Sequence, residues 1–160
     1  MTGGLSLWQM LFDTMGQSLL IVLLPAYLFA LIKGDKTDRL CAHVLAIGAV
    51  LDMMLAVHQQ ASGEPWQYRG DQLIIDLLLL APQSVVATRS SRRYPIIIAA
   101  AQLIIVLAEL LNSGGLIAEE KTLSVLIGFA AAIQLGAFTG GLVAHYTRRR
   151  KSAAATAFAH

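Results

Sequence analysis

The chain has 160 residues, of which 56% are apolar and 14% are charged, and its formal net charge is +2. Soluble domains carry about a quarter charged residues, so this composition excludes a soluble enzyme, a nucleic-acid-binding domain and a disordered chain. The single cysteine, Cys41, excludes an internal disulfide framework and a four-thiolate metal site.

Five apolar stretches follow one another along the chain, and each has about the length needed to cross a lipid bilayer as a helix. They are the ranges 12–32, 40–58, 72–88, 94–113 and 123–146. Lipid offers the backbone no hydrogen-bond partners, so a segment that crosses it must satisfy its own polar groups. The sequence therefore predicts an all-α, polytopic membrane protein, a bundle of five transmembrane helices. It forms one domain over residues 1–151, and residues 152–160 are expected to be a loosely ordered cytoplasmic tail.

The fourth stretch has recognisable capping residues at both ends. Pro95 falls in the first turn of the fourth stretch, where its missing N–H costs little. The run Asn112-Ser113-Gly114-Gly115 follows the same stretch and predicts a glycine C-cap.

Lysine and arginine predict the orientation, because cytoplasmic loops are enriched in both. Ten of the 12 basic residues fall on one side of the five predicted spans. They are Lys33, Lys36, Arg39, Arg89, Arg92, Arg93, Arg148, Arg149, Arg150 and Lys151. This places the N-terminus outside and the C-terminus in the cytoplasm, and we expect a bacterial inner membrane. The arginine clusters set topology and rest on anionic headgroups, so no nucleic-acid partner is needed to explain them.

Four carboxylates lie within or at the rim of the predicted spans: Asp13, Asp52, Asp76 and Glu109. With the predicted orientation, all four belong to the outer half of the bilayer, together with His58 and Asn112. An ionised aspartate at a helix centre costs roughly 2.5–3.5 kcal/mol on the insertion scale, and no lysine or arginine lies at that depth. These acids must therefore be protonated, exposed to water in an outward-facing pocket, or neutralised by a cation.

Helical spacing places these acids on polar stripes. Gln72, Asp76 and Gln83 share one face of the third stretch, and Gln102, Glu109 and Asn112 share one face of the fourth. Two interpretations stay open. The stripes either form hydrogen bonds that fix helix packing, or they line an outward-open site for a cation or proton.

The histidines suggest two further sites. His58 and the acids could ligate zinc or manganese, although His58 does not share a helix face with Asp52. His43 and His145 lie near the same membrane face and could hold a haem. Histidines at the membrane interface explain the same positions more simply, so we predict no metal and no cofactor.

Small residues recur every four positions through the fifth stretch: Ser124, Gly128, Ala132, Gly136, Gly140 and Ala144. Such a groove lets a second helix approach closely. The approaching helix belongs either to the same chain, which we favour slightly, or to a second copy or a membrane partner subunit.

The leading hypothesis from the sequence is a binding, accessory or assembly protein of the membrane, with a polar outward-facing pocket and no catalytic activity of its own. The alternative is a proton- or cation-coupled transporter or channel component that uses the intramembrane carboxylates. A third hypothesis is an intramembrane hydrolase in which Asp52 and Asp76 share a proton.

Overall fold

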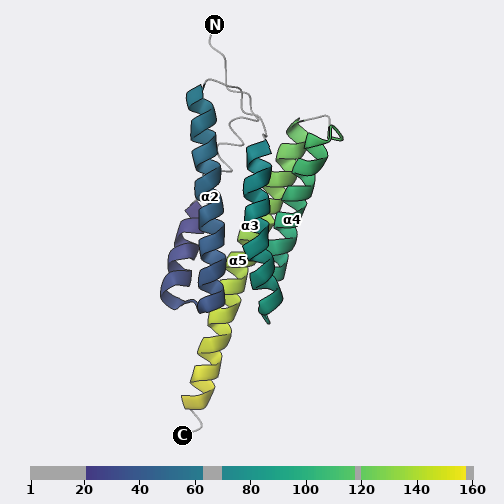
Figure 1. The fold of residues 1–160 in the computed structure, drawn as a ribbon. Helices are drawn as coiled ribbons and strands as arrows, with labels where there is room; N and C mark the ends of the chain where they lie inside the picture. Colours follow the sequence, from purple (N-terminus) through teal and green to yellow (C-terminus); the bar gives the residue numbers. More distant parts are fainter. Residues whose placement is uncertain (1–20, 63–69, 118–119, 158–160) are drawn as a thin grey trace.

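The computed structural model describes residues 21–62, 70–117 and 120–157, and in these ranges the chain forms five helices (Figure 1). They are Ile21–Lys33, α2 (Lys36–Ser62), α3 (Gly70–Arg89), α4 (Tyr94–Ser113) and α5 (Glu120–Ala157). The last four are long and apolar enough to cross a membrane. The all-helical prediction is confirmed for the described residues. The first predicted span, 12–32, overlaps the helix Ile21–Lys33, and its first part lies outside the described residues.

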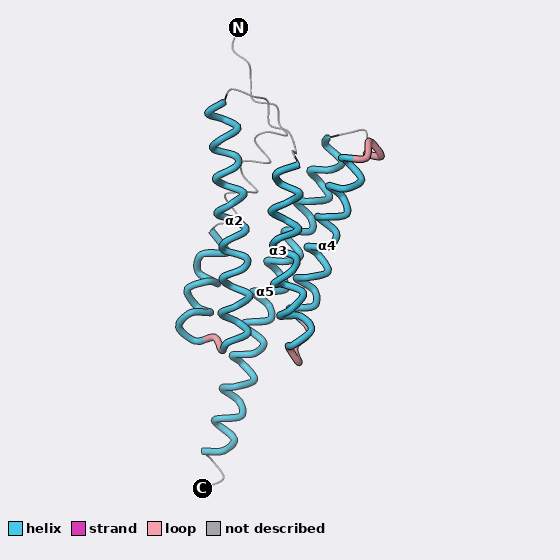
Figure 2. Tube along the Cα trace, viewed as in Figure 1, coloured by secondary structure: helices cyan, strands magenta, loops and turns pink. Residues whose placement is uncertain are grey.

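Successive helices from α2 to α5 run in opposite directions, and the described loops between helices are short (Figures 1 and 2). Loops 34–35 and 90–93 lie at one end of the bundle, which we call the basic end. The opposite end, where α4 leads into α5, is the far end. Helix α4 packs against both α3 and α5, while α2 packs mainly against α3. Gly48 of α2 permits this approach, since a Cβ atom there would lie 3.0 Å from the Leu79 side chain.

Both ends of helix α4 have the capping residues that its sequence predicts. Pro95 lies in its first turn. At its other end Gly115 adopts the left-handed φ of 73°, and the Leu116 N–H donates to the Leu111 carbonyl over 2.9 Å. This hydrogen bond satisfies a carbonyl group that the end of a helix would otherwise leave without a partner.

Helix α5 is longer than predicted. The sequence suggested a loosely ordered tail from residue 152, but the helix continues to Ala157. Its last turns contain a run of alanines, the strongest helix formers, and they project beyond the other helices (Figure 1).

Large apolar side chains cover the outside of the bundle. Phe129 is 67% exposed and Ile21 is 71% exposed, and similar residues occur on every described helix. An apolar surface of this extent suits contact with lipid and would favour aggregation in water.

One cluster of buried apolar residues lies toward the basic end, and we call it the apolar layer. It consists of Ala30, Cys41, Ala42, Tyr94, Ile98, Phe138 and Leu142. Because these residues come from the helix Ile21–Lys33, α2, α4 and α5, the layer joins segments that are distant in the sequence.

Candidate functional site

The structure brings together three of the four predicted acids, Asp52, Asp76 and Glu109, which we call the acid cluster. Asp76 of α3 is 6% exposed and Glu109 of α4 is 5% exposed. Their carboxyl groups lie next to each other. Asp52 of α2 has an exposed side chain and interacts with Asp76 through its charge. The fourth predicted acid, Asp13, lies outside the described residues.

Gln102 of α4 connects the acid cluster to α3 and α5. Its Nε2 donates to Asp76 Oδ1 over 2.7 Å. Its Oε1 accepts from Gln134 Nε2 at 2.7 Å and from Gln83 Nε2 at 3.3 Å. Gln134 was missed in the sequence analysis. The available signal was that Gln134 is the one amide side chain in the fifth apolar stretch, 123–146, and lies near its middle.

Three oxygens in this region accept no hydrogen bond from any donor in the described part of the chain. They are both carboxyl oxygens of Glu109 and the Oε1 of Gln83. A buried carboxylate without a donor is costly, because desolvation is not repaid. The described ion pairs all lie at the basic end, so none neutralises these acids. A proton shared between Asp76 and Glu109 would supply the missing donor and remove a charge.

His58 and Asn112 were predicted beside these acids and take less central positions. His58 is exposed on α2, and Asn112 is half-buried on α4. The metal site that was considered for His58 and the acids, and not predicted, is not assembled by the described residues. There, the one group of three such ligand atoms within 4.8 Å of one another is formed by Asp35, Asp38 and His145.

A second polar cluster, at the basic end, begins with the first turn of α2. The Asp35 N–H donates to Asp38 Oδ2 over 3.0 Å, and the Asp38 N–H donates to Asp35 Oδ1 over 3.1 Å. This reciprocal pair is a capping box, which satisfies two N–H groups at the start of a helix. It also holds the Asp38 side chain inside the bundle, where it is completely buried.

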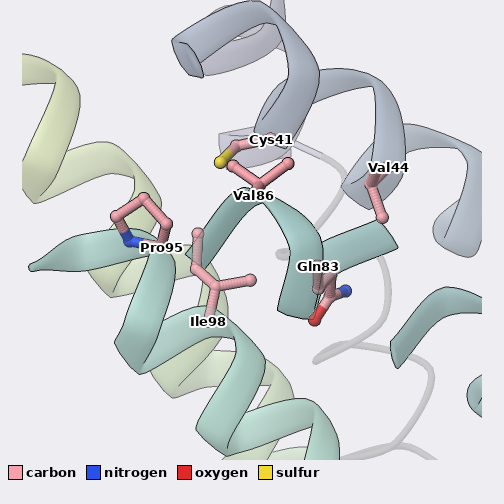
Figure 3. Close-up of a pocket in the computed structure, with 6 residues that line it drawn as sticks. All are labelled: Cys41, Val44, Gln83, Val86, Pro95 and Ile98. Carbon is pink, nitrogen blue, oxygen red and sulfur yellow. The ribbon is translucent and has the colours of Figure 1, made fainter. Parts of the chain in front are cut away.

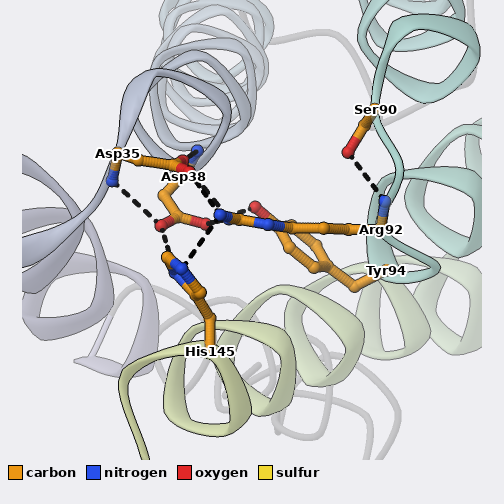
Figure 4. Close-up of polar contacts among 6 residues, drawn as sticks. All are labelled: Asp35, Asp38, Ser90, Arg92, Tyr94 and His145. Atoms are coloured by element: carbon orange, nitrogen blue, oxygen red, sulfur yellow. Dashed lines mark hydrogen bonds and ion pairs between the residues drawn. The ribbon is translucent and has the colours of Figure 1, made fainter. Parts of the chain in front are cut away.

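Three further residues converge on Asp38, as Figure 4 shows. Asp38 Oδ1 accepts from the Tyr94 hydroxyl at 2.6 Å and from Arg92 Nη1 at 2.5 Å. Asp38 Oδ2 lies 3.1 Å from His145 Nδ1, and Arg92 Nη2 lies 3.0 Å from His145 Nε2. Arg92 also pairs with Asp35. We call these five residues the Asp38 network, and they join α2, the loop 90–93, α4 and α5.

The charges in the Asp38 network stabilise one another. Burial alone would raise the pKa of Asp35, but the hydrogen bond from the Asp38 N–H and the charge of Arg92 outweigh it and lower that pKa. Burial alone would lower the pKa of Arg92, but the Asp38 carboxylate, the Tyr94 hydroxyl and the Asp35 carboxylate outweigh it and raise that pKa. Arg92 therefore stays charged and already acts as the cation of the group formed by Asp35, Asp38 and His145.

From the sequence, Arg92 was interpreted as a topology signal and His145 as an interfacial histidine, and no polar cluster was predicted at this end. One available signal was the spacing Asp35–Asp38, which is that of a capping box. The haem interpretation paired His43 with His145. In the structure His43 is exposed and its Nδ1 bonds to the Arg39 carbonyl at 2.6 Å, whereas His145 bonds to Asp38 and Arg92.

The other basic residues assigned to topology lie at the surface, unlike Arg92. They are Lys33, Lys36, Arg39, Arg89, Arg93, Arg148, Arg149, Arg150 and Lys151, and all are exposed.

A small cavity lies among α2, α3 and α4 (Figure 3). Its volume is about 10 Å³, and its lining is formed by Cys41, Val44, Gln83, Val86, Pro95 and Ile98. A cavity that holds one water molecule needs roughly 10–15 Å³ by this measure, so this cavity is of single-water size.

The small-residue stripe of α5 divides into two parts. Ser124 is buried and Gly128 is half-buried, whereas Ala132, Gly136, Gly140 and Ala144 are exposed. An added Cβ atom at Gly136 or Gly140 would have no neighbour within 4 Å. Among the described residues, the exposed part therefore does not serve the internal packing that we favoured. Binding of a second copy or partner subunit there stays a prediction.

The fold and these sites define a small helical bundle with apolar outer surfaces and a cluster of three carboxyl groups, two of which are buried. No family model, curated protein or solved structure matches the chain.

Proposed function

We propose that the protein binds protons in the membrane, as a proton-coupled transporter or channel component that works through Asp76 and Glu109. The observation that carries the proposal is the carboxyl group of Glu109, which is buried beside a second buried acid and accepts no hydrogen bond from the described residues. Two adjacent acids in lipid cannot both carry a charge without a large cost, so the pair takes up and releases a proton as its surroundings change.

A purely structural role accounts less well for this arrangement. Polar groups that fix helix packing do so by satisfying one another, as the amides of Gln83, Gln102 and Gln134 largely do. Glu109 adds a buried acid to that set without a donor. Intramembrane acids without cationic partners are typical of proton relays.

A proton suits the acid cluster better than a metal ion does. Metal sites in proteins need several ligand atoms around one point. The described residues do not bring three ligand atoms of the acid cluster within 4.8 Å of one another. A hydrolase would need Asp52 and Asp76 as a pair, whereas the direct neighbours of Asp76 are Glu109 and Gln102.

The proposal includes the orientation inferred from the basic residues, with the basic end in the cytoplasm of a bacterium and the N-terminus outside. The acid cluster then belongs to the outer half of the inner membrane. The accessory or assembly role stays a prediction, since nothing in the described residues covers the exposed stripe of α5.

The experiment that tests the proposal measures proton flux in reconstituted vesicles. Purified protein is placed in vesicles that hold a pH-sensitive dye, and a potassium gradient with valinomycin sets the membrane potential. We expect the wild type to accelerate proton entry, and we expect Glu109→Gln and Asp76→Asn to reduce the rate to that of empty vesicles. Asp71→Asn is the matched control, because Asp71 is an exposed acid at the start of α3.

A hydrophobic carbodiimide provides a second readout, because it reacts with protonated carboxyl groups within lipid. Mass spectrometry should find the adduct on Glu109 or Asp76, and labelling should decline as the pH is raised. The proposal is wrong if Glu109→Gln and Asp76→Asn both conduct protons like the wild type.

A further inference from the structure

The amide side chains of Gln83, Gln102 and Gln134 form a chain of hydrogen bonds that ends at the acid cluster. All three side chains are buried, and they come from α3, α4 and α5. Gln134 Nε2 donates to Gln102 Oε1 over 2.7 Å, and Gln102 Nε2 donates to Asp76 Oδ1 over 2.7 Å. Gln83 Nε2 donates to the same Gln102 oxygen over 3.3 Å. Gln102 therefore connects the amides to the carboxyl groups.

Backbone carbonyl groups fix the direction of this chain. An amide side chain can be turned so that its nitrogen and oxygen exchange places, and its hydrogen-bond partners decide which way it lies. Gln102 Nε2 lies 3.3 Å from the Asp76 carbonyl oxygen, and Gln134 Nε2 lies 3.3 Å from the Ile98 carbonyl oxygen. Because a carbonyl oxygen can only accept, each amide must turn its nitrogen toward it. Gln102 thus presents an N–H group to the Asp76 side chain whether or not that side chain carries a proton.

The two buried acids are unequal as a result. Asp76 accepts a hydrogen bond from Gln102, whereas neither carboxyl oxygen of Glu109 accepts one from the described residues. A hydrogen bond to a charged acceptor is roughly twice as strong as one to a neutral acceptor, so the N–H group of Gln102 favours a charge on Asp76. A proton on Glu109 makes that carboxyl group a donor beside the Asp76 carboxylate.

The third acid of the cluster does not reverse this difference. Asp52 of α2 is exposed and interacts through its charge with both Asp76 and Glu109. The described ion pairs all lie at the basic end, so within the described ranges no ion pair favours a charge on Glu109. The contact with Gln102 is therefore what distinguishes the two buried carboxyl groups.

We propose that Gln102 is a positioning residue that holds the negative charge of the buried pair on Asp76 and the shared proton on Glu109. This inference rests on the proposed function, in which the pair binds a proton, and it gives the two carboxyl groups different roles. Glu109 carries the proton, and Asp76 is the fixed charge beside it. Gln134 supports this arrangement, because its bond to Gln102 Oε1 keeps the amide turned toward Asp76.

Infrared spectroscopy with isotope labels locates the proton, because the carbonyl stretch of a protonated carboxyl group is separate from the bands of a carboxylate. Cell-free synthesis introduces heavy carbon into the side-chain carboxyl group of either glutamate or aspartate, and spectra are taken in lipid vesicles at neutral pH. We expect a glutamate band, which shifts with labelled glutamate and disappears in Glu109→Gln. An aspartate band, which shifts with labelled aspartate and disappears in Asp76→Asn, should be absent. The inference is overturned if the wild type shows this aspartate band or lacks the glutamate band.

Gln102→Leu tests the role of the amide, and Gln83→Leu is the matched control. Each variant removes a buried amide, but Gln83→Leu leaves the bonds from Gln134 to Gln102 and from Gln102 to Asp76 in place. Gln102→Leu should gain the aspartate band, because Asp76 loses the donor that favours its charge. Gln83→Leu should keep the wild-type spectrum.

Equal spectra for the two leucine variants would overturn the positioning role, because a merely structural role of buried amides affects both alike. Far-ultraviolet circular dichroism shows whether each variant is folded, and the wild-type spectra decide where the proton lies even if Gln102→Leu does not fold.

Proton flux in the same vesicles separates a failure of this inference from a failure of the proposed function. Wild-type flux together with the aspartate band overturns the assignment of the proton to Glu109 and leaves the proposed function standing. A glutamate band without flux overturns the proposed function and still supports the role of Gln102 at the buried pair.

Discussion

The buried carboxylate of Asp38 should contribute more to stability than any other acid at the basic end. Its side chain is completely buried and accepts hydrogen bonds from Tyr94 and Arg92, and it bonds to His145 as well. Asp38→Asn keeps the volume of the side chain and removes its charge. Breaking a buried ion pair from one side costs about 3–5 kcal/mol, because the remaining charge loses its partner without regaining water.

The expected cost of Asp38→Asn lies at the lower end of this range of about 3–5 kcal/mol. Arg92 is 23% exposed at its side chain and keeps its pairing with Asp35, so its charge is not left alone. The asparagine oxygen can still accept from Tyr94. We therefore expect a loss of about 3 kcal/mol in the free energy of unfolding. Asp35→Asn is the internal comparison. The Asp35 side chain is 40% exposed, and ion pairs at such positions are worth about 1 kcal/mol or less.

The assay is unfolding of the purified protein in mixed micelles with increasing denaturing detergent, followed by far-ultraviolet circular dichroism. A double-mutant cycle that combines Asp38→Asn with Arg92→Gln isolates the energy of the pair. Asp38→Asn and Asp35→Asn should differ clearly. Equal losses, within about 0.5 kcal/mol, would show that burial of Asp38 adds nothing to the pair and would refute the reasoning.

Two further predictions concern single positions in the bundle. Gly141→Ala should destabilise the protein by about 1–3 kcal/mol, because the added Cβ would lie 2.8 Å from the Tyr94 Cβ. At Gly140 an added Cβ has no neighbour within 4 Å, so Gly140→Ala should be neutral or slightly stabilising. Equal melting temperatures for the two alanine variants would contradict the packing of α5 against Tyr94. The lowered pKa of Asp35 predicts that this carboxylate stabilises the protein above its ordinary pKa of 3.8, and that the benefit disappears as the pH falls through the lower pKa of the folded state. The wild type should thus exceed Asp35→Asn by a constant margin from neutral pH to about pH 5, and the margin should vanish in stronger acid; a margin that grows on acidification would contradict this sign.

The helices were predictable because their signals are local. Each long apolar stretch by itself predicts a helix, and capping residues such as Pro95 and Gly115 indicate where a helix begins or ends. The acid cluster was partly predictable for a similar reason. The spacing of Asp76 and Gln83, and of Gln102 and Glu109, places each pair on one helix face. Their meeting across α3 and α4 depends on how the two helices face each other, which periodicity does not specify.

The Asp38 network was not predictable as a site. Helix α2 begins at Lys36, four residues before the apolar stretch that predicts it, so Asp38 lies in its first turn and not in a loop. Its partners Arg92 and His145 are 54 and 107 residues away along the chain. Each looks ordinary in its own segment, one as a topology signal and the other as an interfacial histidine. Only packing at the basic end brings them to one carboxylate.

The uneven distribution of strong polar contacts has a mechanical consequence. Charged hydrogen bonds at the basic end join α2, α4 and α5, whereas neutral amides join the helices in the middle of the bundle. Hydrogen bonds between helices within lipid are weak and average about 0.6 kcal/mol each. Rigid-body tilting of a helix would thus pivot at the basic end. Glu109 lies 15 residues beyond Tyr94, about 22 Å along α4, so a tilt of about 5° displaces it by about 2 Å. A small rotation about a fixed basic end would in this way change the surroundings of the Glu109 carboxyl group, which accepts no hydrogen bond from the described residues.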